Sequence, residues 1–223
     1  MDFKRFAIYH LPDAELGRFG SSWLGWDARK GRTLPHPDLP LPIDKLVSTP
    51  ARYGFHATLK APFRLADGAT AQEVAGAMRA ICAQLSGFEM PVSLQDDWGF
   101  MALRPEGPPP PQLIALEAAL VTRLDHLRAP LTEAERARRH PDRLPPKALA
   151  HLDHWGYPFV LDAFQYHLTL TGALPVPQQQ DIRKVLDPVL APLLARPMPV
   201  RAVALMGEDR AGFFHLIEEV PLA

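Results

Sequence analysis

The sequence predicts an α+β fold made of two similar lobes, each in the order strand, helix, strand, strand, whose antiparallel sheets face a central cleft. Three observations lead to this prediction. Prolines divide the chain at 34–50, 108–111, 141–146 and 197–199, and proline interrupts both helices and central strands. Between these joints, strand-like runs alternate with segments of helical periodicity. The same order of patterns then occurs twice, which indicates an internal duplication.

The first half of the chain contains the elements of one lobe. Residues 3–10 and 53–63 have the composition of strands, and apolar and polar residues alternate in the second of these runs. Thr70 and Glu73 form a capping-box pair before a helix expected at 71–85. Strand-like runs follow at 89–94 and 99–103, a second helix is expected at 112–127, and short helices are expected at 132–155.

The second half repeats the pattern. A strand at 164–171 precedes a helix whose apolar residues Ile182, Leu186, Val189 and Leu193 have the spacing of Val74, Met78, Ile81 and Leu85. Further on, Val203 and Leu205 correspond to Val92 and Leu94, and 212–216 resembles 99–103 as Gly-Phe-x-x-Leu. We therefore expect one domain, residues 1–223, made of lobes at about 1–128 and 155–223 and a helical connector at 129–154.

Composition limits the classes of function. With 47% hydrophobic residues, the 223-residue chain is able to bury a sizeable core. The formal net charge of -1 argues against long nucleic acid, whose affinity depends on many basic contacts. Cys82 is the only cysteine, which leaves no thiolate cluster for a metal and suggests a reducing, cytoplasmic location. No window approaches a membrane span, so no membrane contact is expected, and the oligomeric state is not determined by the sequence.

Two His-x-Thr-Leu tetrads, at 56–59 and 167–170, occupy matching positions of the duplication. In a strand, residues i and i+2 share a face, so His56 lies beside Thr58, and His167 beside Thr169. Two imidazoles that converge from pseudo-symmetric lobes suit a phosphodiester, because one accepts a proton from water while the other donates to the departing alkoxide. The hydroxyls hold the non-bridging oxygens. This chemistry requires neither a metal nor a cofactor.

Secondary candidates follow from position along these strands. Lys60 and Thr171 continue the faces of the two tetrads and are predicted to contact the phosphate, although Lys60 also fits a solvated strand end. Four aromatic residues are candidates for lining the cleft and stacking on a base or sugar, or alternatively for the core: Tyr9, Tyr53, Trp155 and Tyr157. Arg5 and Arg52 are candidate anion contacts.

The remaining histidines fit structural roles. His10 and His215 fall in expected strands, His36 and His140 stand beside prolines, and His126 ends a helix, where a cation complements the dipole. His151 and His154 flank Asp153, but no third ligand is apparent nearby, so no metal site is predicted.

The residues around the tetrads resemble the 2H phosphoesterase superfamily, which includes RNA ligase-like 2′-5′ and cyclic phosphodiesterases. Three segments, Arg52–Phe63, Trp155–Pro158 and Phe164–Gly172, are similar to a bacterial branch encoded beside phosphonate-utilisation genes, and the 23–25 and 128–130 segments extend the likeness over nearly the whole chain. The resemblance implies the 2H phosphoesterase, or RNA ligase-like, fold. It also implies that His56, Thr58, His167 and Thr169 form the catalytic set and that the substrate is a small cyclic phosphodiester, such as a ribose cyclic phosphate from phosphonate breakdown.

Two other functions remain open. The first is a 2H module that binds or processes RNA ends, and the second is a non-catalytic component of a phosphonate-processing assembly. We expect instead a metal-independent 2H-type cyclic phosphodiesterase, a hydrolase acting on a small nucleoside or ribose cyclic phosphate. Neither the ring size nor the assignment of base and acid to the two histidines follows from the sequence.

Overall fold

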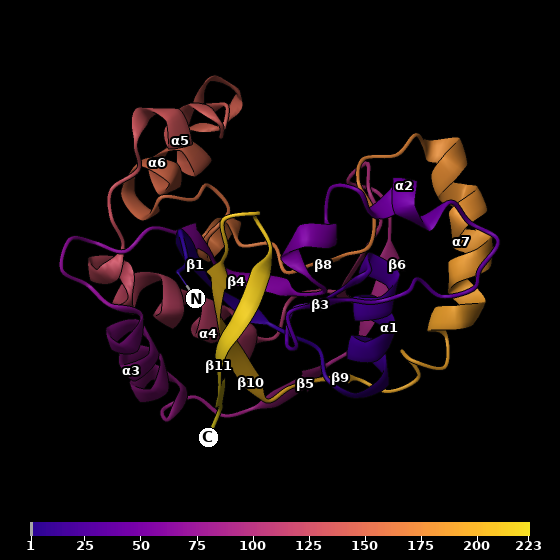
Figure 1. The fold of residues 1–223 in the computed structure, drawn as a ribbon, viewed down its shortest axis with the longest axis horizontal. Helices are drawn as coiled ribbons and strands as arrows, with labels where there is room; N and C mark the ends of the chain where they lie inside the picture. The colour runs from indigo at the N-terminus through magenta and orange to yellow at the C-terminus, as the bar shows by residue number, and fades with distance from the viewer. Residues whose placement is uncertain (1) are drawn as a thin grey trace.

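The structure, a computed structural model, describes residues 2–223 as two groups of elements arranged side by side (Figure 1). The first group is built on a four-stranded antiparallel sheet with the order β11-β10-β1-β4. Its strands are β1 (Arg5–His10), β4 (Ala57–Phe63), β10 (Ala202–Glu208) and β11 (Phe214–Pro221). Helix α3 (Ala71–Cys82) contacts β10 and β11, and α4 (Pro111–Arg123) contacts β4. The predicted capping box of Thr70 and Glu73 begins α3.

The second group is built on the three-stranded sheet β6-β7-β8. It consists of β6 (Val92–Gln95), β7 (Ala102–Pro105) and β8 (Leu168–Thr169), with α1 (Ala14–Leu24), α2 (Ile43–Val47) and α7 (Val176–Leu190) around them. Trp23 of α1 donates its indole N–H to the carbonyl of Leu170, at 2.7 Å. Arg183 of α7 donates to the carbonyl of Leu94, at 2.8 Å. These bonds hold the helices against β8 and β6.

The two repeats exchange strands. In the first sheet, β4 of the first repeat lies with β10 and β11 of the second, and in the other sheet β8 of the second repeat pairs with β7 of the first. Strands β5 (Phe88–Met90) and β9 (Met198–Val200), one from each repeat, pair with each other between the two sheets. The antiparallel α+β prediction is confirmed. The sequence did not predict the exchange, because periodicity carries no information about pairing partners.

The connector forms a separate helical layer at the top of Figure 1. It contains α5 (Glu133–Ala137), the short 3-10 turn η3 (Pro141–Arg143) and α6 (Pro146–Trp155), and the 3-10 turns η2 (Asp125–Leu127) and η4 (Leu161–Ala163) flank it in the sequence. The remaining elements are the small pair β2 (Trp26–Asp27) and β3 (Arg32–Thr33) and the turn η1 (Ala51–Tyr53). Within residues 2–223, no helix has both the length and the apolar surface needed to traverse a bilayer.

One hydrophobic core extends through both groups of elements. Buried side chains of β4, α3, β7, β8 and α7 belong to a single cluster, which includes Leu59, Val74, Leu103, Leu168 and Leu186. The predicted strand at 164–171 is regular only at Leu168–Thr169, and the predicted helix at 71–85 ends at Cys82. Both tetrad histidines therefore lie one residue before their strands, where the chain enters the sheet.

Candidate active site

The two tetrad histidines are held by the same local geometry. His56 Nδ1 donates to the carbonyl of Gly54 at 2.8 Å, and His167 Nδ1 donates to the carbonyl of Gln165 at 2.8 Å. In both cases the acceptor lies two residues before the histidine. A hydrogen bond from Nδ1 fixes the tautomer of a neutral imidazole and leaves Nε2 as an acceptor. Both rings are half-buried, so each presents Nε2 without being enclosed by the core.

The ring of His56 is held between an aromatic residue and a hydroxyl. It stacks on the buried ring of Tyr9, with 3.6 Å between centroids, and its Nε2 accepts from Thr58 Oγ1 at 3.1 Å. Thr58 pairs with Tyr9 across β4 and β1, which places both side chains at this point of the sheet. The pKa of His56 is lowered to about 4, mainly by desolvation and to a lesser extent by the nearby charge of His167. His56 is therefore neutral at physiological pH.

The ring of His167 has a different aromatic setting. Trp98 and Phe100 approach it edge-on, with centroids 5.7 and 5.9 Å away. The guanidinium of Arg104 lies 3.9 Å from the centroid of Trp98 and forms an ion pair with Asp97. Desolvation is the main cause that lowers the pKa of His167, and the Arg104 charge adds to it.

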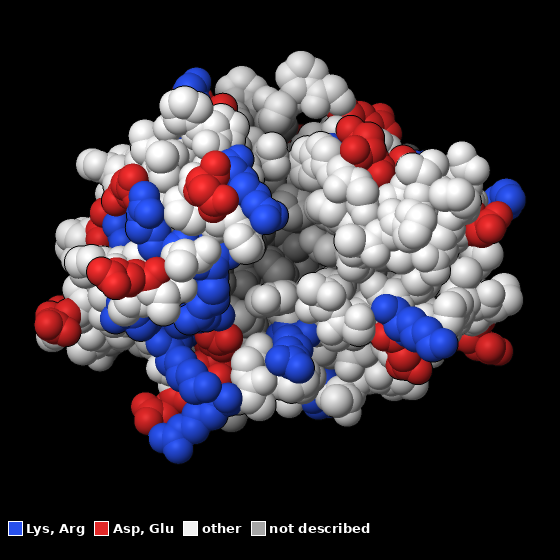
Figure 2. Space-filling view, turned by 90° about the horizontal axis from the view of Figure 1, so that it is seen from above, with Lys and Arg blue, Asp and Glu red and all other residues white. Residues whose placement is uncertain are grey.

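Thr58 and His167 line the same pocket although they come from different sheets. Tyr157 and Glu117 also line it, together with residues from the segment that follows α6. The lowering of the His56 pKa by His167 is the effect expected of two imidazoles that share one site. Figure 2, which looks down on Figure 1 from above, shows a hollow near the middle of this face, with Lys and Arg side chains gathered on its left side.

Lys60 does not share the face of Thr58. A register shift in β4 pairs Tyr9 with Thr58 but Ile8 with Lys60, so an extra residue stands between the two positions. Such a bulge breaks the period of two and re-aims the next side chain. Lys60 is buried, and its ammonium donates to the carbonyl of Val121 at 3.0 Å. The prediction of its orientation was therefore wrong.

Thr171 is also turned away from the pocket, because β8 ends at Thr169. Its hydroxyl accepts from the Met101 N–H at 3.0 Å and donates to the carbonyl of Gly172 at 2.8 Å. With both functions used and 1% of the residue exposed, Thr171 holds the chain after β8 instead of facing the cleft.

The four aromatic candidates are divided between the pocket and its margins. Tyr9 and Tyr157 belong to the site described above. Tyr53 is 39% exposed and its ring centroid lies 6.3 Å from that of His56, so it stands at the rim. Trp155 lines an adjoining pocket with Lys60 and Arg128, which does not include either tetrad histidine.

Sequence reasoning missed several residues of this region. Trp98 and Phe100 flank His167, and the repeated Gly-Phe-x-x-Leu motif at 99–103 was the available signal for Phe100. The buried carboxylate of Glu117 accepts the N–H of Leu161, at 3.1 and 3.2 Å, and gave no signal because it lies within an apolar helix.

Several histidines outside the tetrads have polar partners. His10 Nδ1 is 2.5 Å from the hydroxyl of Tyr166 in the core, and His215 Nε2 is 2.8 Å from Asp209. His151 Nε2 is 2.7 Å from Asp162, which is not a neighbour in sequence. In the described part of the chain, no group of three or more His, Cys, Asp and Glu side chains is placed to hold a metal ion.

Two curated relatives match most of this chain. It is 34% identical over 219 residues to a protein of Janthinobacterium sp. (strain Marseille) named ribose 1,5-bisphosphate phosphokinase PhnN, and 34% identical over 220 residues to a protein of the same name from Laribacter hongkongensis (strain HLHK9). The alignments cover 93% of this chain but 48% and 49% of the relatives. The chain thus spans about half the length of the curated relatives it matches.

Solved structures show a weaker similarity. E. coli LigT complexed with 3′-AMP aligns with a TM-score of 0.45 and 15% identity, covering 100% of this chain and 99% of LigT. A structure described as a phosphoesterase aligns with a TM-score of 0.43 and 15% identity, covering 99% of both chains. Residues 58–215 match a family model described as a protein of unknown function, DUF1045. Because this match extends over well more than half of the sequence, the chain belongs to the DUF1045 family.

Proposed function

We propose that this protein is a cyclic phosphodiesterase that hydrolyses a small nucleoside or ribose cyclic phosphate through His56 and His167, in a pathway linked to phosphonate metabolism. The observation that supports it is the matched geometry of the two imidazoles. Each donates from Nδ1 to a carbonyl two residues earlier at 2.8 Å, and His167 shares a pocket with Thr58, the partner of His56. A structural histidine has no need of this repetition at equivalent positions of two repeats.

The surroundings of the two rings favour different roles. His56, whose pKa falls to about 4, is suited to be the general base. Its Nε2 accepts a proton from water as the water oxygen attacks phosphorus. His167 enters as the imidazolium and donates its Nε2 proton to the departing alkoxide, so that a ring P–O bond breaks and a phosphomonoester forms. The hydroxyls of Thr58 and Thr169 donate to the non-bridging oxygens.

The substrate class is supported by the relatives and by the sequence itself. Both relatives carry the name of a kinase acting on a ribose phosphate. This chain contains no Gly-x-x-x-x-Gly-Lys-Ser/Thr motif, the loop that cradles nucleotide phosphates in many kinases. A phosphate-ester hydrolase for ribose phosphates is consistent with both facts.

The test is a panel of 2′,3′-cyclic, 1,2-cyclic and linear phosphodiesters, assayed with EDTA present. We expect turnover of a cyclic substrate, and we expect His56→Ala and His167→Ala to lose about 10²- to 10⁴-fold in kcat. His126→Ala is the matched control, because His126 is exposed on η2. Unchanged kcat in both tetrad variants, with the control also unchanged, would remove the histidines from the mechanism.

A further inference from the structure

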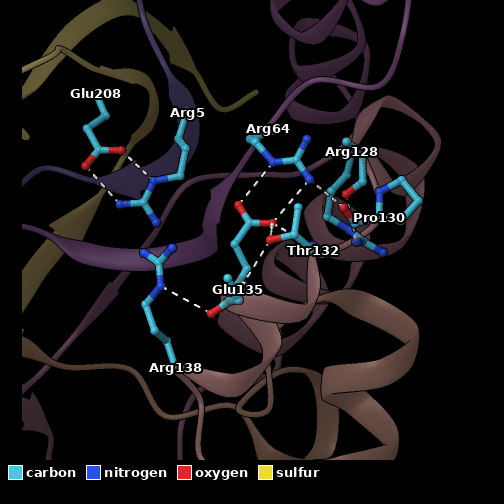
Figure 3. Close-up of polar contacts among 10 residues, drawn as sticks. Arg5, Arg64, Arg128, Pro130, Thr132, Glu135, Arg138 and Glu208 are labelled. Carbon is cyan, nitrogen blue, oxygen red and sulfur yellow. Dashed lines mark hydrogen bonds and ion pairs between the residues drawn. The ribbon is translucent and has the colours of Figure 1, made fainter.

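Two guanidinium groups from distant parts of the chain face each other (Figure 3). Arg138 follows α5 and points toward Arg5 of β1 (Figure 3). Arg5 forms two hydrogen bonds with Glu208, one of them at 2.8 Å. Arg138 donates only its Nε, to the carbonyl of Ala134 at 3.3 Å. Glu208 therefore neutralises Arg5, and Arg138 has no carboxylate of its own.

The neighbouring arginine is also without a carboxylate partner. Among residues 2–223, neither Arg138 nor Arg139 has an acidic group within ion-pairing distance. Other arginines of the same layer do: Arg64 pairs with Glu135 at 3.1 Å, and Arg136 pairs with Asp153 at 2.8 Å. The connector thus neutralises some of its arginines and leaves the positive charges of Arg138 and Arg139 uncompensated.

Contacts relate these charges to the histidine pocket. The guanidinium of Arg139 lies 4.9 Å from the ring centroid of Tyr157, which lines the pocket with Thr58 and His167. Arg5 lies four residues before Tyr9 on β1, and even spacing puts both on the same face of the strand. Four residues of strand correspond to about 13 Å. The reach of a long arginine side chain shortens this separation toward the span of a sugar.

We propose that Arg5, Arg138 and Arg139 bind a second phosphate of the substrate, a phosphomonoester at the opposite end of the sugar from the cyclic phosphodiester. This inference rests on the proposed function and names its substrate class. The planar guanidinium matches two phosphate oxygens at once. A dianion between Arg5 and Arg138 also offsets the repulsion of two like charges, which a neutral sugar does not. Arg138 and Arg139 therefore select substrates that carry the additional phosphate.

The first experiment measures binding without turnover. Ribose 5-phosphate is titrated into the full-length protein by calorimetry, and its Kd is compared among the wild type, Arg138→Ala, Arg139→Ala and Arg143→Ala. We expect each of the first two variants to raise Kd about tenfold or more, as loss of a charge-assisted hydrogen bond does. Arg143, an exposed arginine of the same connector, is the control and should leave Kd unchanged.

The second experiment measures selectivity. We compare kcat/KM for a nucleoside 2′,3′-cyclic phosphate with and without a 5′-phosphate, and we expect Arg138→Ala to reduce the preference for the phosphorylated form about tenfold. Arginine-dependent binding without turnover of any cyclic substrate would uphold the second phosphate site and reject the proposed function. Turnover of a cyclic substrate, with selectivity and binding that do not depend on the arginines, would uphold the proposed function and reject the second phosphate site. Failure to bind ribose 5-phosphate, with arginine-dependent binding of a dinucleotide cyclic phosphate, would reassign the arginines to a nucleic-acid strand.

Discussion

At the residue scale, the chemistry of the site depends on the protonation of two imidazoles. Each Nδ1 is committed to a backbone carbonyl, so proton transfer takes place at Nε2. The hydroxyl of Thr58 donates to His56 Nε2 in the free protein and must rotate toward the phosphate when substrate binds. Burial lowers the pKa of both rings, which keeps His56 free to accept a proton but reduces the fraction of His167 that carries one.

The first prediction concerns the pH dependence of kcat/KM. Catalysis in the proposed mechanism needs His56 neutral and His167 protonated. Since the pKa of His56 is about 4 and that of His167 lies below its ordinary value of 6.5, kcat/KM should reach its maximum between these limits. It should then fall as pH rises, about tenfold per unit above 6.5. Initial rates from pH 4.5 to 8.5 check this. A profile that stays flat up to pH 8 would contradict the assignment of His167 as the acid.

The second prediction compares two threonines that are two residues apart. Thr169 is half-buried at the end of β8, whereas the hydroxyl of Thr171 bridges Met101 and Gly172 in the core. Thr169→Val should lower kcat and leave the free energy of unfolding nearly unchanged. Thr171→Val should cost about 1–3 kcal/mol of stability, because it leaves buried polar groups unpaired. Urea unfolding and initial rates distinguish the two. If both variants lower kcat equally, Thr171 contacts the substrate and its structural assignment is wrong.

At the element scale, a buried carboxylate fixes the segment that leads from α6 to β8. Glu117 of α4 is fully buried and accepts the N–H of Leu161 through both oxygens. Leu161 has a φ of 55°, in the left-handed region that a residue with a Cβ rarely adopts. The hydrogen bonds from Leu161 to Glu117 therefore fix the backbone of the segment that leads into His167. Burial raises the pKa of Glu117 to about 7.

The third prediction follows from that pKa. A carboxyl group whose pKa is raised on folding binds more protons in the native state, so its contribution to stability is greatest below pH 4.5 and is lost as pH rises through about 7. The loss amounts to about 3 kcal/mol. Glu117→Gln stays neutral and keeps an acceptor for Leu161, so it should remove this component of the pH dependence.

Urea unfolding at pH 5.0 and 7.5 measures the effect as the difference between variant and wild type, which cancels the contribution of buried histidines. Glu106→Gln is the matched control, since Glu106 is exposed after β7. If Glu117→Gln retains the pH dependence of the wild type, the carboxyl group is not the source.

At the scale of the whole molecule, each of the two main sheets is completed by the other repeat. β1 pairs with β10 and β4, and β7 pairs with β8, so neither half of the sequence contains a complete copy of the four-stranded or the three-stranded sheet. The core cluster also extends across both groups of elements. A break in the connector therefore leaves every strand pair intact.

The fourth prediction is that cleavage in the connector does not separate the halves. Arg143 is exposed between α5 and α6, a natural site for limited trypsin digestion. The two fragments should elute together in size-exclusion chromatography under native conditions and separate in 6 M guanidinium, about the strength that unfolds even very stable proteins. Separation of the fragments in native buffer would show that the exchanged strands do not hold the halves together.

Local patterns determined much of this protein. Capping at Thr70 and apolar spacing placed α3, alternation placed β4, and the duplicated tetrads identified His56 and His167 as a matched pair. Such signals suffice because capping, periodicity and motif spacing are properties of neighbouring residues. Thr58 and Thr169 are both half-buried, and their role in binding the substrate stays a prediction.

Only the tertiary structure decided which strands exchange, where Lys60 points and which arginines stand beside the pocket. A bulge in β4 depends on its pairing with β1, and the approach of Arg138 to Arg5 joins residues far apart in the sequence. The physical reason is the same in each case. Strand register and the proximity of charges depend on contacts between segments that are far apart in the sequence. Such contacts produce no periodic pattern in the sequence of either segment.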